Sequence, residues 1–324
     1  MRLTKFTALV AASIVVAGSA VAQDRSDWPS SMTVGTASQG GVYFVYGNGL
    51  AAYIAEELGI NSSGEVTGGP VQNVTLVQMG EHGLGLVTMG PMYEAWIGES
   101  ELAPGLEHRD VRALFPMYET PFQGVALRSQ NITSLADLNG KRVSVGPAGG
   151  TPGTYWPRFL EALEVDANVS YAGASDAASQ LQDGLIDAFV FAAGLPIAAF
   201  SQLAAEADVN TFTFSEEEHA QILEAFPEVS SFTIPGGTYT MQDGDQPSVA
   251  MWNFAVVHQD MPESLAYEIT KLVMENNDRM MQIHSAARAT LPENHVNNGF
   301  LPYHPGAVRW FEENGYEIPD DLKG

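Results

Sequence analysis

Residues 32–58, MTVGTASQGGVYFVYGNGLAAYIAEEL, contain the pattern from which the fold can be inferred. A short apolar run at 32–35 is typical of a buried strand, and small or polar residues fill the loop at 35–41. From Val42 onward, apolar side chains recur every three or four residues, which predicts an amphipathic helix. A strand joined to a helix in this way indicates an α/β fold with largely parallel sheets.

The same strand–loop–helix unit recurs along the chain. Small-residue loops at 88–91, 149–154 and 192–196 each lie between an expected strand and an expected helix. Further strands are expected at 84–88, 111–115, 123–127, 142–146, 187–191 and 249–257, and further helices at 155–163, 196–207 and 262–285. The second half repeats the scheme of the first without repeating its sequence, so we expect two lobes with a ligand cleft between them.

The charge balance excludes some classes of partner. The 324 residues include 39 Asp and Glu but only 14 Lys and Arg, which gives a formal charge of −25. Nucleic acids and anionic membranes are bound by clustered basic residues, so neither is an expected partner. Because the acidic residues are scattered along the chain, they favour solvation over recognition of one cationic partner. Cysteine is absent, which removes disulfides and thiol chemistry.

The N-terminus has the organisation of a secretory signal peptide. Arg2 and Lys5 precede an apolar run at 8–17, and Ala20-Val21-Ala22 provides a cleavage pattern. We expect cleavage after Ala22 and release into the periplasm. No later run approaches the roughly 20 apolar residues that cross a bilayer, so no direct membrane insertion is expected.

The known catalytic and metal-binding motifs are missing. The sequence has no G-x-S-x-G, S-x-x-K, H-E-x-x-H or P-loop pattern, and its seven histidines lack ligand spacing. Asp243-Gly244-Asp245 resembles the start of a calcium loop but lacks the later acidic ligands, which favours a polar turn. We therefore expect no enzyme activity, no metal and no cofactor.

The four small-residue loops are the features that point to a ligand. Any one of them is an ordinary connection. Together, in two lobes and each before a helix, they bring helix N-termini with unpaired N–H groups towards one cleft. This arrangement predicts an anion-binding site.

An ordered set of motifs resembles the solute-binding subunits of TAXI-class tripartite ATP-independent periplasmic (TRAP) transporters. They extend over nearly the whole mature chain: Gly35-Thr36, Gly40-Gly41 and Tyr43; Thr67-Gly68-Gly69, Val71 and Asn73; Gly80-Glu81, Val87 and Tyr93; Leu135-Ala136-Asp137-Leu138, Gly140-Lys141-Arg142-Val143 and Val145-Gly146; Asp183-Gly184, Ile186-Asp187-Ala188, Ala193-Gly194 and Pro196; Ile234-Pro235-Gly236-Gly237-Thr238-Tyr239 and His304-Pro305-Gly306-Ala307.

The resemblance implies a two-lobed periplasmic binding protein of the type II-like class, with its ligand cleft between the lobes. The first lobe would comprise 23–119 and a returning segment, 259–324, and the second lobe would comprise 120–258. The protein would be a monomer that captures a carboxylate, such as glutamate or a related dicarboxylate, and delivers it to an ion-gradient-driven TRAP permease. A ligand-binding module for a sensor system and a periplasmic hydrolase are the alternatives.

The same resemblance places the loops around the ligand. Gln39 and Met89 depart from the small polar residues usual in the family, which leaves the identity of the solute open. The candidate ligand-binding residues are Ser38, Gln39, Gly40, Gly41, Tyr43, Thr88, Met89, Tyr93, Gly150, Thr151, Pro152, Gly153, Thr154, Ala193 and Gly194.

Overall fold

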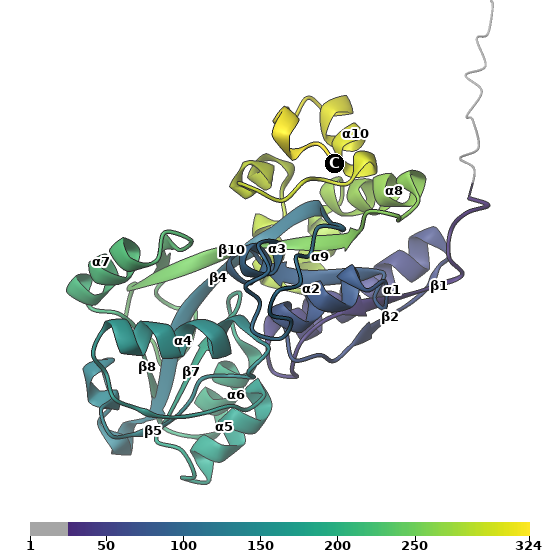
Figure 1. The fold of residues 1–324 in the computed structure, drawn as a ribbon. Helices are drawn as coiled ribbons and strands as arrows, with labels where there is room; N and C mark the ends of the chain where they lie inside the picture. The colour runs from purple at the N-terminus through teal and green to yellow at the C-terminus, as the bar shows by residue number, and fades with distance from the viewer. Residues whose placement is uncertain (1–24) are drawn as a thin grey trace, which may run out of the picture.

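Two α/β lobes share one continuous path of strands in the computed structural model, which describes residues 25–324 (Figure 1). The signal peptide predicted at 1–22, including Arg2, Lys5 and Ala22, lies outside the described residues. The strand order is β2 (Asn61–Glu65), β1 (Ser31–Gly35), β3 (Leu84–Thr88), β10 (Gln246–His258), β4 (Val111–Leu127), β7 (Ala188–Ala192), β5 (Arg142–Ser144) and β6 (Asn168–Ser170). Two further strands pair at the side of this path, β8 (Val209–Phe212) with β4 and β9 (Ser230–Ile234) with β10.

The two lobes repeat one topology. In the first lobe, which is built on β1 to β3, β1 pairs in parallel with both β2 and β3, and β10 adds an antiparallel strand. In the second lobe, which is built on β5 to β7, β5 pairs in parallel with both β6 and β7, and β4 adds an antiparallel strand. Each lobe therefore presents the carboxyl ends of its parallel strands, and the loops that follow them, at one edge of its sheet.

Strand β4 connects the two lobes. It pairs with β10 over 111–121 and with β7 over 122–126. The two separate strands expected at 111–115 and 123–127 are thus one strand, because Pro116 and Pro121 fit an extended backbone although they interrupt the expected pattern. The lobe boundaries expected at 119/120 and 258/259 stay predictions; the strand pairing favours crossings near residues 121 and 250.

The helices cover the faces of these sheets (Figure 1). The first lobe has α1 (Val42–Leu58), α2 (Pro70–Gln78) and α3 (Met89–Trp96), and the second lobe has α4 (Thr151–Ala162), α5 (Ala174–Gln182) and α6 (Ala198–Glu206). The remaining helices are α7 (Glu216–Ala225), α8 (Glu263–Met274), α9 (Asn277–Ile283) and α10 (Pro305–Glu313). The single helix expected at 262–285 is interrupted at Asn276, whose φ of −130° and ψ of 50° are not helical.

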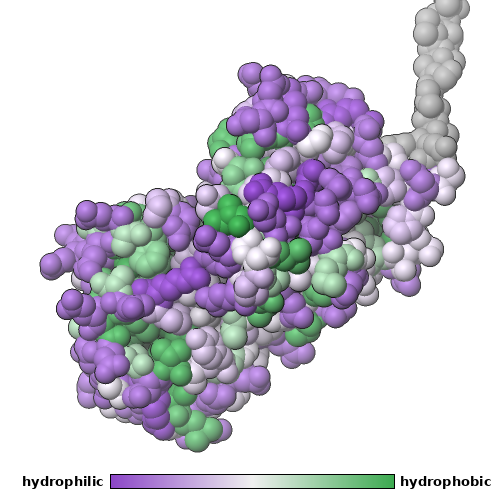
Figure 2. Space-filling model, viewed as in Figure 1, coloured by the Kyte–Doolittle hydropathy of each residue, from purple (hydrophilic) through white to green (hydrophobic). Residues whose placement is uncertain are grey.

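The apolar core consists of two clusters, of which the first extends from the first lobe into the second through Phe189 and Phe200. Val34, Leu86 and Phe254 are fully buried in the first. In the second, Trp156 stacks on Phe214 with ring centroids 5.5 Å apart. Hydrophilic residues cover most of the face shown in Figure 2, in keeping with the acidic composition. No helix within 25–324 is both long and apolar enough to cross a membrane.

Candidate functional site

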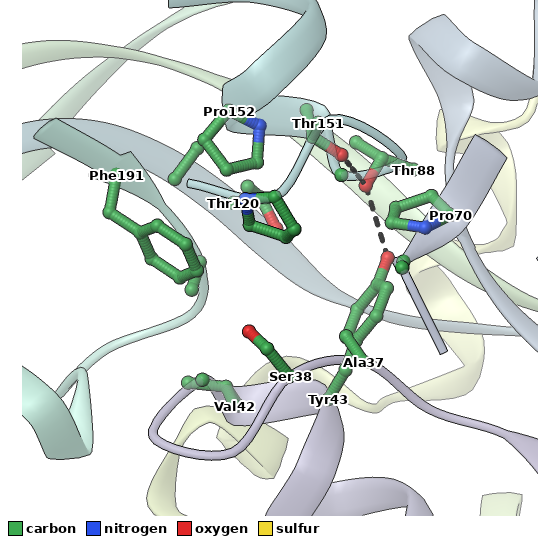
Figure 3. A pocket seen from close by; sticks show the side chains of 17 residues that line it. Ala37, Ser38, Val42, Tyr43, Pro70, Thr88, Thr120, Thr151, Pro152 and Phe191 are labelled. Carbon is green, nitrogen blue, oxygen red and sulfur yellow. Dashed lines mark hydrogen bonds between the residues drawn. The ribbon is translucent and has the colours of Figure 1, made fainter. Parts of the chain in front are cut away.

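A cavity lies between the lobes, at the loops that follow the parallel strands (Figure 3). Its empty volume is about 380 Å³, including space open to solvent. The first lobe contributes residues near Ser38, Gly69 and Thr88, and the second contributes residues near Gly150 and Phe191. Only about 30 Å³ of this space can be reached by the centre of a water molecule, so the cavity is narrow while the lobes are closed.

Four helix N-termini meet at this cavity. Its lining includes the N-cap residues of α1, α2, α3 and α4, which are Gly41, Gly69, Thr88 and Gly150. None of these caps forms a side-chain hydrogen bond to its helix, and none of the four helices has an acidic residue in its first turn. Each N-terminus carries about half a positive charge from its aligned peptide dipoles, so the cavity favours an anion.

A cluster of hydroxyl groups forms one wall of the cavity (Figure 3). Tyr43, Thr88 and Thr120 all donate to the side-chain oxygen of Asn253, and Thr151 donates to the Thr88 hydroxyl over 2.7 Å. Burial raises the pKa of Tyr43 further above its ordinary value of 10.0, so its hydroxyl stays protonated. This wall is polar but uncharged.

Glycines allow the lobes to approach closely beside the cavity. A Cβ atom at Gly69 would lie 2.9 Å from the Gly150 Cα, and one at Gly149 would lie 3.4 Å from the Gly68 backbone. The Val71 N–H of the first lobe donates to the Gly149 carbonyl of the second over 3.1 Å. The lobes are therefore closed on each other at this point.

The other rim of the cavity also joins the lobes. The Ser175 N–H donates to the Gln39 carbonyl over 3.2 Å, and the Ala199 N–H donates to the Gly40 carbonyl over 3.1 Å. The Ser38 hydroxyl accepts from the Ala174 N–H over 3.2 Å, which leaves its own proton available to a ligand. The loop that contains Ser38 thus both lines the cavity and joins the lobes.

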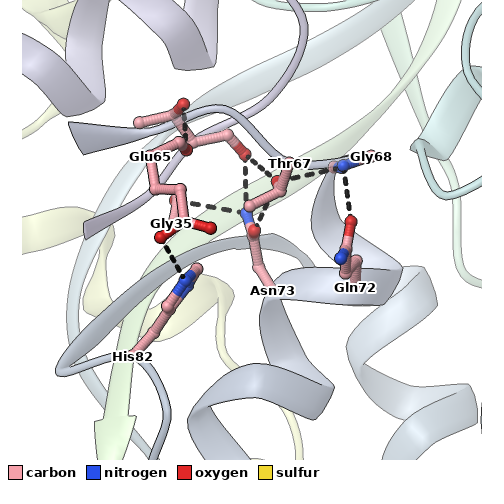
Figure 4. A network of polar contacts seen from close by, with 9 residues as sticks. Gly35, Glu65, Thr67, Gly68, Gln72, Asn73 and His82 are labelled. Atoms are coloured by element: carbon pink, nitrogen blue, oxygen red, sulfur yellow. Dashed lines mark hydrogen bonds and ion pairs between the residues drawn. The ribbon is translucent and has the colours of Figure 1, made fainter. Parts of the chain in front are cut away.

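A buried amide positions the glycine loop at 68–69 (Figure 4). The Asn73 side chain is fully buried and donates to the carbonyls of Thr36 and Leu86, both over 2.8 Å. Its oxygen accepts from the Thr67 hydroxyl over 2.7 Å, and that hydroxyl in turn accepts from the Gly69 N–H. Asn73 therefore ties the loop to the ends of β1 and β3.

No charged side chain is among the cavity-lining residues in the part of the chain that the structure describes. Arg158, in the second turn of α4, instead forms ion pairs with Glu94 and Glu101. Partial burial opposes its ionisation, but the hydrogen bonds and charges of these glutamates outweigh this effect and raise the pKa of Arg158 above its ordinary value. Because α3 and α4 belong to different lobes, this ion-pair cluster is a second connection between them.

The cavity brings together part of the set expected from the sequence. The candidate residues that line it are Ser38, Gly41, Tyr43, Thr88, Gly150, Thr151, Pro152 and Ala193. Helix α4 begins at Thr151, four residues before the expected start, so the third loop supplies the helix N-terminus itself. Their role as ligand contacts stays a prediction.

The other candidates lie outside the cavity lining. Gln39 and Gly40 contact the opposite lobe through their carbonyls. Gly153 and Gly194 pack against Pro147 and Tyr118, where a Cβ atom would overlap its neighbour. The remaining three also lie elsewhere: Met89 and exposed Tyr93 line a neighbouring groove, and Thr154 is buried in α4.

Some lining residues were not among the candidates. They are Ala37, Val42, Gly68, Gly69, Pro70, Thr120, Pro147, Phe191 and Ala192. Gly68-Gly69-Pro70 carried a usable signal, since two glycines followed by proline mark a helix start. Thr120 carried none, because it lies in the middle of a strand and reaches the cavity only where β4 passes between the lobes.

Comparison with known proteins identifies similar sequences and folds. A profile of the NMT1-like family matches residues 34–315. A solved structure described as a periplasmic transporter aligns with 83% of this chain and 96% of its own, at 13% identity and a TM-score of 0.51. At this identity the match shows the fold alone, that of two-lobed periplasmic solute-binding proteins.

Two further solved structures cover similar shares of the chain. An ancestral arginine-binding protein bound to arginine aligns with 79% of this chain and 97% of its own, at 17% identity and a TM-score of 0.49. A substrate-binding protein of an ABC uptake transporter from Streptococcus pneumoniae, with bound histidine, aligns with 78% of this chain and 90% of its own, at 15% identity and a TM-score of 0.49.

Proposed function

We propose that this chain, which belongs to the NMT1-like family, is a solute-binding protein. It captures a small organic anion between its lobes. The proposal rests on the four helix N-termini that meet at one cavity. None of them has a side-chain cap or an acidic residue in its first turn. Donors of this kind stabilise an oxyanion without a basic side chain. A carboxylate is the expected form of that anion, with the Ser38 hydroxyl as an additional donor, whereas Thr151 gives its single proton to Thr88.

We further propose that the protein works outside the cytoplasm and delivers its solute to a membrane permease. The predicted signal peptide and the fold shared with a periplasmic transporter support this location. The ordered TAXI-type motifs support an ion-gradient-driven TRAP permease as the partner. The site has the hydroxyls and backbone donors of a binding cleft, and we assign it no catalytic role.

A ligand screen tests the binding proposal. Residues 23–324 are titrated with succinate, glutarate, 2-oxoglutarate, 4-methylpentanoate and their amino-acid counterparts, and the melting temperature is measured. A ligand that binds only the folded state raises it by mass action. Absence of any shift across the panel would contradict the proposal.

The Gly149→Val variant tests whether binding requires closure. Gly149 lies outside the left-handed region, and a side chain there would point at the Gly68 backbone of the other lobe. We expect the variant to keep its unliganded melting temperature and to lose the ligand-induced shift. Gly299→Val is the matched control, since nothing lies within 4 Å of a Cβ atom at Gly299.

The partner is tested separately by capture of tagged protein on membranes that contain either a TRAP permease or a sensor kinase. Retention by a TRAP permease, dependent on the bound carboxylate, is the expected result. Retention by a sensor kinase alone would replace transport by signalling and leave the binding proposal intact.

A further inference from the structure

The cavity has donors for an anion but no counterpart for a cation. Its lining residues include no Asp or Glu, and the polar side chains among them are the hydroxyls of Ser38, Tyr43, Thr88, Thr120 and Thr151. An ammonium group needs an opposite charge when it is removed from water. Hydroxyl oxygens are neutral acceptors and supply none.

Five backbone carbonyls of the loops around the cavity already accept hydrogen bonds. Those of Gln39, Gly40 and Gly149 accept the interlobe bonds from Ser175, Ala199 and Val71. Within the loops, the Ser38 carbonyl accepts from the Gly41 N–H over 3.3 Å, and the Pro147 carbonyl accepts from the Gly150 N–H over 2.9 Å. Closure therefore engages these carbonyls, and it also uses one N–H donor in the first turn of each of α2, α5 and α6.

The electrostatic field in the cavity also opposes a cation. The four N-termini of α1, α2, α3 and α4 direct positive partial charges at the same space. In the adjoining groove, Glu94 is paired with Arg158. An ammonium group would thus be repelled without compensation.

The rest of the lining is apolar. Val42, Phe191 and Pro152 face the cavity, together with prolines and alanines of both lobes (Figure 3). Phe191 is buried in the closed form, with its ring next to Gly41 and Gly146. Such walls suit a carbon skeleton more than a second polar group.

From these observations, and resting on the proposed function, we propose that the solute is an organic acid without an ammonium group, so that the cleft selects against zwitterionic amino acids. A keto, hydroxy or unsubstituted acid would place its carboxylate at the helix ends and its carbon skeleton against Phe191.

Matched ligand pairs test this selectivity. Isothermal titration calorimetry of residues 23–324 compares 2-oxoglutarate with glutamate, and 4-methyl-2-oxopentanoate with leucine. The members of each pair share a carboxylate and a carbon skeleton and differ at the α-position. We expect the oxo acid to bind roughly a hundredfold more tightly than its amino acid in any pair that binds.

The outcomes separate this inference from the proposed function. An amino acid that binds as tightly as its oxo acid, or more tightly, would overturn the inference and leave solute binding in place. If no member of either pair binds, and the wider panel of carboxylates also fails, the proposed function itself falls. Tight binding of an oxo acid with weak binding of its partner supports both.

Discussion

The N-terminus of α7 and those of the four cleft helices are built in opposite ways. At α7, Ser215 accepts a hydrogen bond from the Glu218 N–H, and the Glu218 side chain accepts from the Ser215 N–H. Glu216, Glu217 and Glu218 occupy its first turn. At α1, α2, α3 and α4, no cap bonds to the helix and no acidic residue lies in the first turn.

On the proposed function, the difference marks the place where an external anion would bind. Capping and acidic residues stabilise a helix N-terminus, and an effective cap contributes about 1 kcal/mol. In a chain with 39 acidic residues, their absence from all four cleft termini leaves N–H groups that a bound solute can satisfy. The α7 terminus is capped within the chain, whereas the proposed function has a ligand supply the acceptors at the cleft termini.

The largest effect on ligand affinity is expected from an acidic cap added to a cleft helix, because its N-terminus then resembles that of α7. Gly41 has an extended conformation suited to a capping residue, and a Cβ atom there would lie 3.6 Å from the Phe191 ring. We expect Gly41→Asp to weaken carboxylate binding by about a hundredfold or more, since two negative charges would share the cavity. Calorimetry with the panel member that gives the largest thermal shift measures the change.

Gly41→Asn is the matched control, because it adds a similar side chain and a cap without a charge. We expect it to bind more tightly than Gly41→Asp by at least tenfold. Equal losses in the two variants would attribute the effect to bulk and remove the electrostatic explanation.

Removing the α7 cap should affect stability and not binding. Ser215→Ala leaves first-turn N–H groups of an exposed helix without their acceptor, and we expect a loss of about 1 kcal/mol in the free energy of unfolding. Urea denaturation measures this loss, and Ser215→Thr should recover part of it. A parallel loss of carboxylate affinity would mean that α7 is coupled to the cleft.

The ion pairs that Arg158 forms between the lobes should contribute least to ligand affinity. Arg158 pairs with Glu94 and Glu101 and does not line the cavity, so it acts on closure alone. Since half-exposed ion pairs contribute at most about 1 kcal/mol, we expect Arg158→Ala to weaken binding by less than tenfold, and high salt to reduce the difference from wild type. A hundredfold loss would make Arg158 a direct ligand of the carboxylate.

Much of the fold follows from local patterns in the sequence. The apolar periodicity that begins at Val42 predicts α1, and the short apolar run at 84–88 predicts β3. Local patterns fail where distant segments decide the structure. Pro116 and Pro121 divide β4 in the sequence, but pairing with β10 keeps it one strand.

The candidate site is predictable at the loops and not beyond them. Glycines next to helix starts indicate Gly41 and Gly150, which line the cavity. The sequence does not show which face of a helix end meets the other lobe. The predicted site therefore includes Gly153 and Met89, although Gly153 packs against Pro147 and Met89 lines a neighbouring groove. Thr120 and Phe191 reach the cavity only through the relative position of the lobes.

The pairing of β3 with β10 also has a consequence for the order in which the chain folds. Thr88 pairs with Asn253, so the sheet of the first lobe stays incomplete until β10 has been synthesised. The second lobe draws its strands from 122–212, within which Phe122 pairs with Ala192 and Leu127 with Val209. Because shorter loops close at lower entropic cost, we expect β4 to pair with β7 and β8 before β10 completes the sheet of the first lobe.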